Sequence, residues 1–293
     1  MLEIQHLTRR FGEHVAVADV SFTVADGRLT GFVGGNGAGK TTTMRMVMGV
    51  LAIHGGEVHW DGRPITPEDR RAFGYMPEER GLYPKQPVLD QLVYLGRLHG
   101  LAAAVARTTA TDLLERFGLA DRARDKVESL SLGNQQRVQI AAAVIADPVA
   151  LILDEPFSGL DPRAVDSMVD LLREYAHRGV PVLFSSHQLD LVERLCDSLV
   201  ILSNGRVVAS GTAEQLRRSG RVRHRLVLGG DAGWVRDLGD VTVVDVDGPT
   251  ALLELPDETA GTRLLTEALR RGSVHEFAPV IPTVSEIYRE VTA

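Results

Sequence analysis

The stretch GGNGAGKT, residues 34 to 41, has the residue types and spacing that hold phosphate. It satisfies G-x-x-x-x-G-K-[ST], with an apolar run before it (LTGFVG) and a run of helical character after it (TTTMRMVMGVL). In such a loop the glycines let backbone N–H groups converge on phosphate oxygens. Lys40 would reach the β- and γ-phosphates, and the Thr41 hydroxyl could ligate Mg²⁺. This context favours phosphate binding over a chance glycine-rich turn.

Two adjacent carboxylates end a second apolar run, ALILDEP, at positions 150 to 156. Asp154 could hold Mg²⁺ through water, and Glu155 could accept a proton from an attacking water. The alternative is an acidic pair that faces solvent. A third run, VPVLFSSH, brings His187 to the end of another strand. Ligands of open α/β sheets bind at the carboxyl ends of strands, so we expect His187 at the same edge.

A polar turn, SLSLGN, at residues 129 to 134, precedes a run of helical character, QQRVQIAAAVI. The first N–H groups of a helix have no partner within it and attract anions. No lysine stands nearby, so this would be a second and weaker phosphate-binding turn. The alternative is that Ser131 simply caps the helix.

The elements that must position these residues follow from hydrophobic periodicity. Residues 1 to about 30 alternate apolar and polar side chains, and GGEVHWDGRPI reads as a hairpin with Trp60 on a packed edge, so both indicate antiparallel strands. Residues 90 to about 145 have helical spacing. ALILDEP and VPVLFSSH are continuous apolar runs, typical of strands buried in a parallel sheet, and a crossover helix lies between them.

The predicted fold is therefore α/β, with a mixed or parallel sheet, an antiparallel β subdomain and a helical subdomain at about 85–145. After Arg218 the pattern of the sequence changes: it predicts strands at RHRLVL, VTVVDV and TALLELP, and helices at GTRLLTEALRRG and TVSEIYREV. We expect a large first domain at 1–218 and a small α+β appendage at 220–293.

Composition narrows the class of protein. The chain has 293 residues, 44% of them hydrophobic, and a net charge of −7. This charge argues against a protein that coats nucleic acid without sequence preference, which would need a basic surface. The single cysteine, Cys196, allows no disulfide within the chain, and we place it on an apolar helix face. The start lacks the layout of a secretion signal, and no apolar run approaches the roughly 20 residues of a membrane span. We expect a cytoplasmic chain that does not cross a membrane by itself.

The order of the motifs over residues 2 to about 217 resembles the nucleotide-binding subunit of ABC transporters, which have a P-loop NTPase core. Phe11 matches the aromatic residue that stacks on adenine, and GYMPE matches the region of the glutamine loop. LSLGN matches the signature LSGGQ, and ILDEP, SGLD around Asp161 and SSH follow in the family's order. The phosphate-loop residues that the resemblance assigns to nucleotide are Gly34, Asn36, Gly37, Ala38, Gly39, Lys40, Thr41 and Thr42.

The resemblance implies that two such domains pack head to tail and bind ATP and Mg²⁺ between them. Ser131, Gly133 and Asn134 of one subunit would then close on the γ-phosphate that the other subunit holds, which explains the missing lysine. Glu155, His187 and Lys40 would be the catalytic residues. Hydrolysis would power a separate transmembrane permease from the cytoplasmic face of the membrane, and no direct nucleic-acid binding is expected.

The sequence PEERGLYP and the appendage are similar to a subgroup of bacterial exporters. Three departures from the family pattern matter: Gly35 replaces a proline, Leu132 and Asn134 replace a glycine and a glutamine of the signature, and Glu78 replaces a glutamine that contacts Mg²⁺. Glu78 is a candidate metal ligand that adds a negative charge, so either hydrolysis is tuned or the side chain points elsewhere.

Several alternatives stay open. The chain could be a soluble ABC ATPase that acts on ribosomes or DNA, or a weakly hydrolysing, ATP-sensing regulatory subunit. The dimer could be a homodimer or a heterodimer. We expect the permease to dock near Glu78, Arg80 and Tyr83, by analogy with the family alone, and the appendage to stabilise the chain or support a dimer rather than sense an effector.

Overall fold

The computed structural model describes residues 1–79, 81–219 and 223–292. They form two compact units, Met1–Ala213 and Glu214–Ala293. The division between the units falls shortly before Arg218, where the sequence pattern changes.

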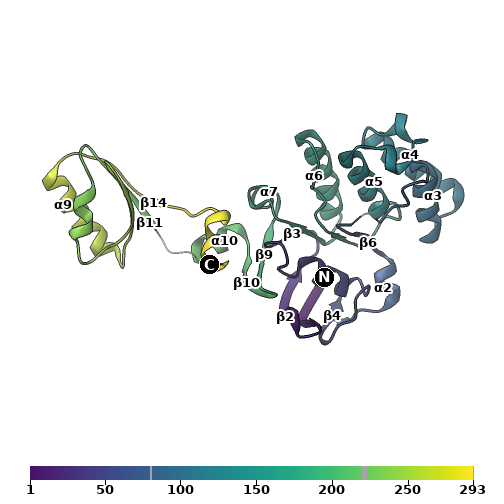
Figure 1. Ribbon diagram of the computed structural model, residues 1–293, viewed down its shortest axis with the longest axis horizontal. Coiled ribbons are helices and arrows are strands. Elements are labelled where there is room, and N and C mark those ends of the chain that lie inside the picture. The colour runs from purple at the N-terminus through teal and green to yellow at the C-terminus, as the bar shows by residue number, and fades with distance from the viewer. Residues whose placement is uncertain (80, 220–222, 293) are drawn as a thin grey trace. The chain divides into compact units, whose positions relative to one another are not determined.

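A six-stranded sheet is the centre of the first unit (Figure 1). Its strand order is β10-β9-β3-β8-β7-β6, and all neighbours are parallel except β9 and β10. The strands are β3 (Leu29–Val33), β6 (Phe73–Met76), β7 (Ala150–Leu153), β8 (Val182–Ser186), β9 (Ser198–Ser203) and β10 (Arg206–Gly211). Every residue of β3, β7 and β8 is buried, as their continuous apolar runs predict. The predicted α/β class is confirmed.

A second sheet, antiparallel and of order β2-β1-β4-β5, forms the predicted β subdomain. Its strands are β1 (Leu2–Phe11), β2 (His14–Val24), β4 (Gly55–Trp60) and β5 (Arg63–Pro64). Trp60 packs edge-on against Phe73 with ring centroids 4.8 Å apart, so the packed edge is confirmed.

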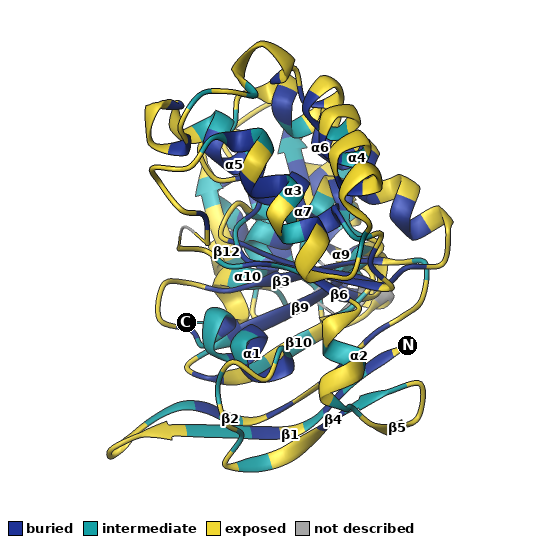
Figure 2. Cartoon of the chain, turned by 90° about the vertical axis from the view of Figure 1, so that its right-hand side faces the viewer, coloured by how far each residue is buried: buried dark blue, intermediate teal, exposed yellow. Residues whose placement is uncertain are grey.

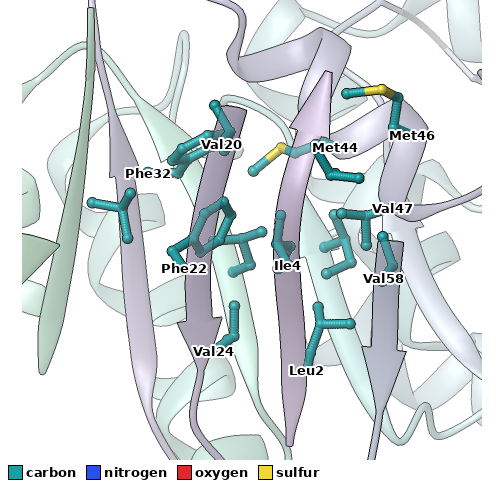
Figure 3. Close-up of a cluster of buried hydrophobic side chains, with 14 of the residues drawn as sticks. Leu2, Ile4, Val20, Phe22, Val24, Phe32, Met44, Met46, Val47 and Val58 are labelled. Carbon is teal, nitrogen blue, oxygen red and sulfur yellow. The ribbon is translucent and has the colours of Figure 1, made fainter. Parts of the chain in front are cut away.

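The main core lies between these two sheets and around helix α1 (Lys40–Val47), as Figure 3 shows. The buried side chains labelled there are Leu2, Ile4, Val20, Phe22, Val24, Phe32, Met44, Met46, Val47 and Val58. The core therefore fixes the helix that follows the phosphate loop.

Helices cover the other face of the six-stranded sheet, where Figures 1 and 2 show α5 and α6 above it. Helix α6 buries one face and exposes the other, as amphipathic helices do, whereas α5 is buried over most of its surface. The helical elements of this unit are α2 (Pro67–Arg71), α3 (Val88–Leu98), α4 (Ala103–Arg116), η1 (Ala120–Arg122), η2 (Val127–Ser129), α5 (Leu132–Val144), α6 (Pro162–His177) and α7 (Leu189–Leu195).

Two details of the first unit differ from the sequence interpretation. Strand β6 was not predicted, because four residues with a central glycine show no periodicity, and only its pairing with β7 defines it. Cys196 does not lie on a helix face: α7 ends at Leu195, and Cys196 has extended backbone angles. Its side chain nevertheless packs against β3, beside Gly31, and burial raises the pKa of its thiol.

The second unit has its own antiparallel sheet, of order β12-β13-β11-β14, and its own core. Its elements are α8 (Ala213–Ser219), β11 (Arg223–Leu228), η3 (Gly233–Asp237), β12 (Thr242–Asp247), β13 (Thr250–Glu254), α9 (Glu258–Arg271), β14 (Val274–Val280) and α10 (Val284–Thr292). The predicted strands and helices are present, so the α+β class of the appendage is confirmed. Edge strand β14 was not predicted, since Pro279 near its end weakens the strand pattern.

Candidate functional site

The phosphate loop connects β3 to α1 and closes around the side chain of Lys40. The Lys40 Nζ donates hydrogen bonds to the carbonyl oxygens of Gly34 at 2.7 Å and Gly35 at 3.3 Å. Gly39, which precedes the helix, has a φ of 104°, and a Cβ there would lie 2.6 Å from the carbonyl oxygen of Ala16. Only glycine fits this approach, so the loop holds an almost fully buried ammonium group beneath its backbone.

Asp154 stands at the end of β7 with its side chain fully buried. The Ser185 hydroxyl donates a hydrogen bond to its Oδ1 at 2.5 Å. Its Oδ2 is buried and has no hydrogen-bond partner among the described residues. Burial raises the pKa of this carboxyl, against the opposing effect of Ser185. A buried acceptor without a donor is an open position that a cation can fill.

Glu155 follows in a strained conformation, with a φ of 52° in the left-handed region. Its backbone N–H donates to the same Ser185 hydroxyl at 2.8 Å, so one serine fixes both carboxylate residues. The Glu155 carboxylate lies 2.9 Å from His187 Nδ1 and 3.8 Å from Lys40 Nζ. Backbone strain of this kind clusters at functional sites, and this carboxylate is in a position to polarise a water.

Glu78 points into this site rather than away from it. The Thr41 hydroxyl donates to Glu78 Oε2 at 3.1 Å. The pairing of β6 with β7 explains the approach, because the Asp154 N–H donates to the Met76 carbonyl at 2.8 Å and Glu78 follows two residues later. Thr41, Glu78 and Asp154 therefore come together from three separate parts of the sequence.

A cleft of about 680 Å³ opens over these groups. Phe11 lines its outer part with an exposed ring, and the Arg9 guanidinium carbon lies 4.9 Å from the centre of that ring. Of the residues predicted from sequence, the cleft is lined by Phe11, Asn36, Gly37, Ala38, Gly39, Lys40, Thr41, Thr42, Glu78, Glu155 and His187. Gly34 and Asp154 do not line the cleft: the Gly34 carbonyl oxygen accepts a hydrogen bond from Lys40, and the Asp154 side chain is buried.

The signature turn contributes only Leu132 to the lining of this cleft. Ser131 caps α5 by accepting a hydrogen bond from the Asn134 N–H at 3.4 Å. Asp161 caps α6 through the Ala164 N–H at 3.0 Å, and its carboxylate pairs with Arg137 at 3.1 Å. None of the predicted residues Ser131, Gly133, Asn134 and Asp161 lines the cleft.

Two residues that the sequence interpretation left without a role complete the geometry. Ser185 holds Asp154 and Glu155, and its only signal was its place in SSH. Gln136, buried in α5, donates its side-chain amide to the Glu155 carbonyl oxygen at 2.8 Å. Nothing in the sequence distinguishes Gln136 from Gln135 and Gln139, the other two buried glutamines of α5.

A phosphate loop between a buried strand and a helix, with carboxylates at the ends of neighbouring strands, defines a P-loop ATPase. Family models match two segments: "ABC transporter" over residues 17–158, and "ATP-binding protein DrrA1-3-like, C-terminal domain" over residues 211–292. The chain belongs to the ATP-binding subunits of ABC transporters, and its cassette binds ATP.

Known proteins resemble the chain over most or all of its length. The uncharacterized ABC transporter ATP-binding protein YhaQ of Bacillus subtilis is 38% identical, over 99% of this chain and 98% of its own. The Nod factor export ATP-binding protein I of Burkholderia lata is 37% identical, over 74% of this chain and 73% of its own. Both relatives are ATP-binding proteins by name.

Solved structures give the same fold. A structure titled as the ATP-binding subunit of an ABC transporter is 35% identical, covers 75% of this chain and 92% of its own, and has a TM-score of 0.70. A dimeric bacterial ABC transporter cassette is 22% identical, covers 72% of this chain and 98% of its own, and has a TM-score of 0.66, which supports the fold alone. None of the helices in the described part of the chain is both long and apolar enough for a membrane span.

Proposed function

We propose that the chain is the ATPase of an exporter and works as a dimer with two ATP molecules at the subunit interface. The observation that carries this proposal is the split site: one cleft gathers Lys40, Glu155 and His187, while Ser131, Gly133 and Asn134 do not line it and only Leu132 of the signature turn reaches its edge. The phosphate-binding groups predicted for this turn do not line the cleft of their own subunit, so they are available for the nucleotide of a second subunit. Dimeric cassettes among the structural neighbours are consistent with this arrangement.

The residues present fit Mg²⁺. The hydroxyl of Thr41 and the carboxylates of Asp154 and Glu78 are oxygen ligands, as Mg²⁺ prefers. Asp154 Oδ2 has no hydrogen-bond partner within the described ranges, which leaves a position for the ion. When bound, Mg²⁺ would neutralise charge on the β- and γ-phosphate oxygens. These three side chains would hold it.

The remaining side chains would act on ATP and on the attacking water. Phe11 would stack on the adenine, and the backbone N–H groups from Asn36 to Thr42 would cradle the phosphates. Lys40 would exchange its hydrogen bonds with the loop carbonyls for the β- and γ-phosphates. Glu155 would polarise the water, with His187 holding its carboxylate and bonding the γ-phosphate.

In the partner subunit's site, Ser131, the Gly133 N–H and Asn134 would close on the γ-phosphate. Asp161 would support the same interface, since it ties α6 to Arg137 of the signature helix. Closure of the dimer would move the permease and hydrolysis would release it.

The export direction is supported by the Nod factor export relative and by the match of the second unit to the C-terminal domain of DrrA-like proteins. We assign the ATPase to residues 1–218 and an accessory function to 220–293. The chain would be held at the cytoplasmic face of the membrane by a separate permease. Of the docking residues expected from sequence, Tyr83 is exposed and Arg80 lies outside the described residues.

The test is the Glu155→Gln variant, compared with the wild type for ATP turnover and for oligomeric state by light scattering. The variant should bind Mg·ATP but not hydrolyse it, because an amide cannot accept a proton from the attacking water. We therefore expect a stable ATP-bound dimer and turnover reduced at least a hundredfold. Glu115→Gln, an exposed position on α4, is the matched control and should behave as the wild type. A Glu155→Gln protein that binds ATP and stays monomeric would refute the dimer.

A further inference from the structure

Glu78 and Asp154 place two carboxylates beside one threonine hydroxyl. Thr41 Oγ1 donates to Glu78 Oε2 at 3.1 Å, and Asp154 presents a fully buried Oδ2 that has no partner in the described part of the chain. The Asp154 N–H donates to the Met76 carbonyl oxygen at 2.8 Å, and Glu78 follows Met76 by two residues, so the two carboxylates lie at neighbouring strand ends. The two groups therefore belong to one electrostatic site.

The Lys40 ammonium forms no ion pair with either of these two carboxylates. The Lys40 ammonium is held by two loop carbonyls and lies 3.8 Å from Glu155 Oε1. Among the described residues, neither Glu78 nor Asp154 forms an ion pair. Two carboxylates close together, one of them buried, are unfavourable unless a cation joins them.

We propose that Glu78 and Asp154, with the Thr41 hydroxyl, form a divalent-cation site that binds its ion before the nucleotide arrives. This inference rests on the proposed function. In the metal-free protein Glu78 accepts the Thr41 hydrogen bond, and on metal binding it exchanges this bond for the ion. A glutamine at position 78 would offer an oxygen but no charge, so the ion would depend on the phosphates for its affinity.

The ligand set also limits the affinity. In the part of the chain that the structure describes, no group of three or more His, Cys, Asp and Glu side chains could hold a metal ion. Two carboxylates and a hydroxyl leave the remaining positions to water, and phosphate oxygens would later replace some of that water. Binding without nucleotide should therefore be measurable but modest.

A second consequence concerns ATP. Without a metal ion, the Glu78 carboxylate repels the γ-phosphate, and with the ion in place this repulsion becomes attraction through the cation. Metal and nucleotide are thus coupled, and the coupling acts equally in both directions. The gain in ATP affinity on adding metal should be larger in the wild type than in Glu78→Gln.

The experiment titrates the nucleotide-free full chain with Mn²⁺ and follows free Mn²⁺ by electron paramagnetic resonance, with Mg²⁺ as competitor. We expect one Mn²⁺ per wild-type chain, displaced by Mg²⁺, and binding at least tenfold weaker in Glu78→Gln. Glu79→Gln removes the same charge from the adjacent exposed position and should bind Mn²⁺ as the wild type does. A fluorescent ATP analogue in EDTA reports nucleotide binding separately and should bind more tightly to Glu78→Gln.

The outcomes separate this inference from the proposed function. A wild type that binds the analogue but takes up no Mn²⁺, or a Glu78→Gln variant with wild-type Mn²⁺ affinity, would overturn the early metal site alone. Equal weakening in Glu79→Gln would overturn it as well, because the effect would then be one of net charge. A wild type that fails to bind the nucleotide analogue even with Mg²⁺ present would instead refute the proposed ATPase site.

Discussion

The side-chain amide of Gln136 lies 2.8 Å from the backbone carbonyl oxygen of Glu155. Gln136 belongs to α5, the helix that Ser131 caps, and Glu155 holds His187 and approaches Lys40. One hydrogen bond therefore links the turn that we assign to the partner's ATP with the carboxylate that we assign to this subunit's ATP. Glu155 has a strained φ, so the hydrogen bond from Gln136 to its carbonyl oxygen helps to hold the residue in this conformation.

Replacing Gln136 by methionine should slow turnover more than it weakens ATP binding. Methionine keeps the volume but removes the donor, so the Glu155 carbonyl loses its partner and the carboxylate loses part of its support. We expect turnover lower by about tenfold, equivalent to roughly 1.4 kcal/mol in the barrier. Steady-state turnover and nucleotide affinity would be measured side by side.

Gln135→Met is the matched control, because Gln135 is equally buried and donates to the Leu130 carbonyl at 2.9 Å. Each variant should lose a similar amount of stability, about 1–3 kcal/mol, for one buried bond. Equal losses of turnover in the two variants would show that helix stability, and not the link to Glu155, explains the effect.

The sequence was sufficient for the elements with strong periodicity and for the contiguous motifs. Strands β3, β7 and β8 are continuous apolar runs, and the phosphate loop carries its own pattern. The contacts from Ser185 to Asp154 and Glu155, and from Thr41 to Glu78, could not be predicted, because they depend on the order and register of β6, β7 and β8. A four-residue strand such as β6 has too few residues to show a period, yet it decides where Glu78 lies.

Asp161 allows a structural function to be separated from a contribution to the dimer. Its carboxylate caps α6 by accepting the Ala164 N–H, and this bond is the main cause of its lowered pKa. Asp161→Ala should lower the melting temperature at pH 7, whereas Asp161→Asn should largely keep it, since asparagine also caps helices well. If Asp161 also supports the dimer, Asp161→Asn should reduce turnover without loss of stability.

The pH dependence of the same cap has a definite sign. A lowered folded-state pKa means that the ionised carboxylate stabilises the fold above the ordinary value near pH 4, and that this is lost as the pH falls through the lowered pKa. The difference in melting temperature between wild type and Asp161→Ala should therefore shrink between pH 5 and pH 3, as followed by circular dichroism. A difference that grows on acidification would contradict the cap.

Arg223 should hold α10 within the second unit. Its side chain pairs with Glu290 of α10 and, at 3.4 Å, with Glu254 of β13. Arg223→Met keeps the apolar stem and removes both pairs, so amide hydrogen exchange in α10 should become about tenfold faster. ATP binding should not change, since every residue that lines the cleft belongs to Met1–Ala213. Arg225→Met, at an exposed position on the same strand, is the control. Equal exchange rates in the two variants would show that Arg223 does not hold α10.

Lys40 should not tolerate arginine, although the chain otherwise uses arginine almost everywhere and has lysine only at positions 40, 85 and 126. Its ammonium fits beneath two loop carbonyls at 2.7 and 3.3 Å, a space that suits a compact point charge and not a planar fork. Lys40→Arg should lower ATP affinity at least tenfold, whereas Lys85→Arg and Lys126→Arg, both exposed, should have no effect. Calorimetric titration with ATP would measure all three, and circular dichroism would confirm that each is folded. Wild-type affinity in a folded Lys40→Arg would mean that the loop opens before nucleotide binds, so that the enclosed ammonium is not what selects lysine.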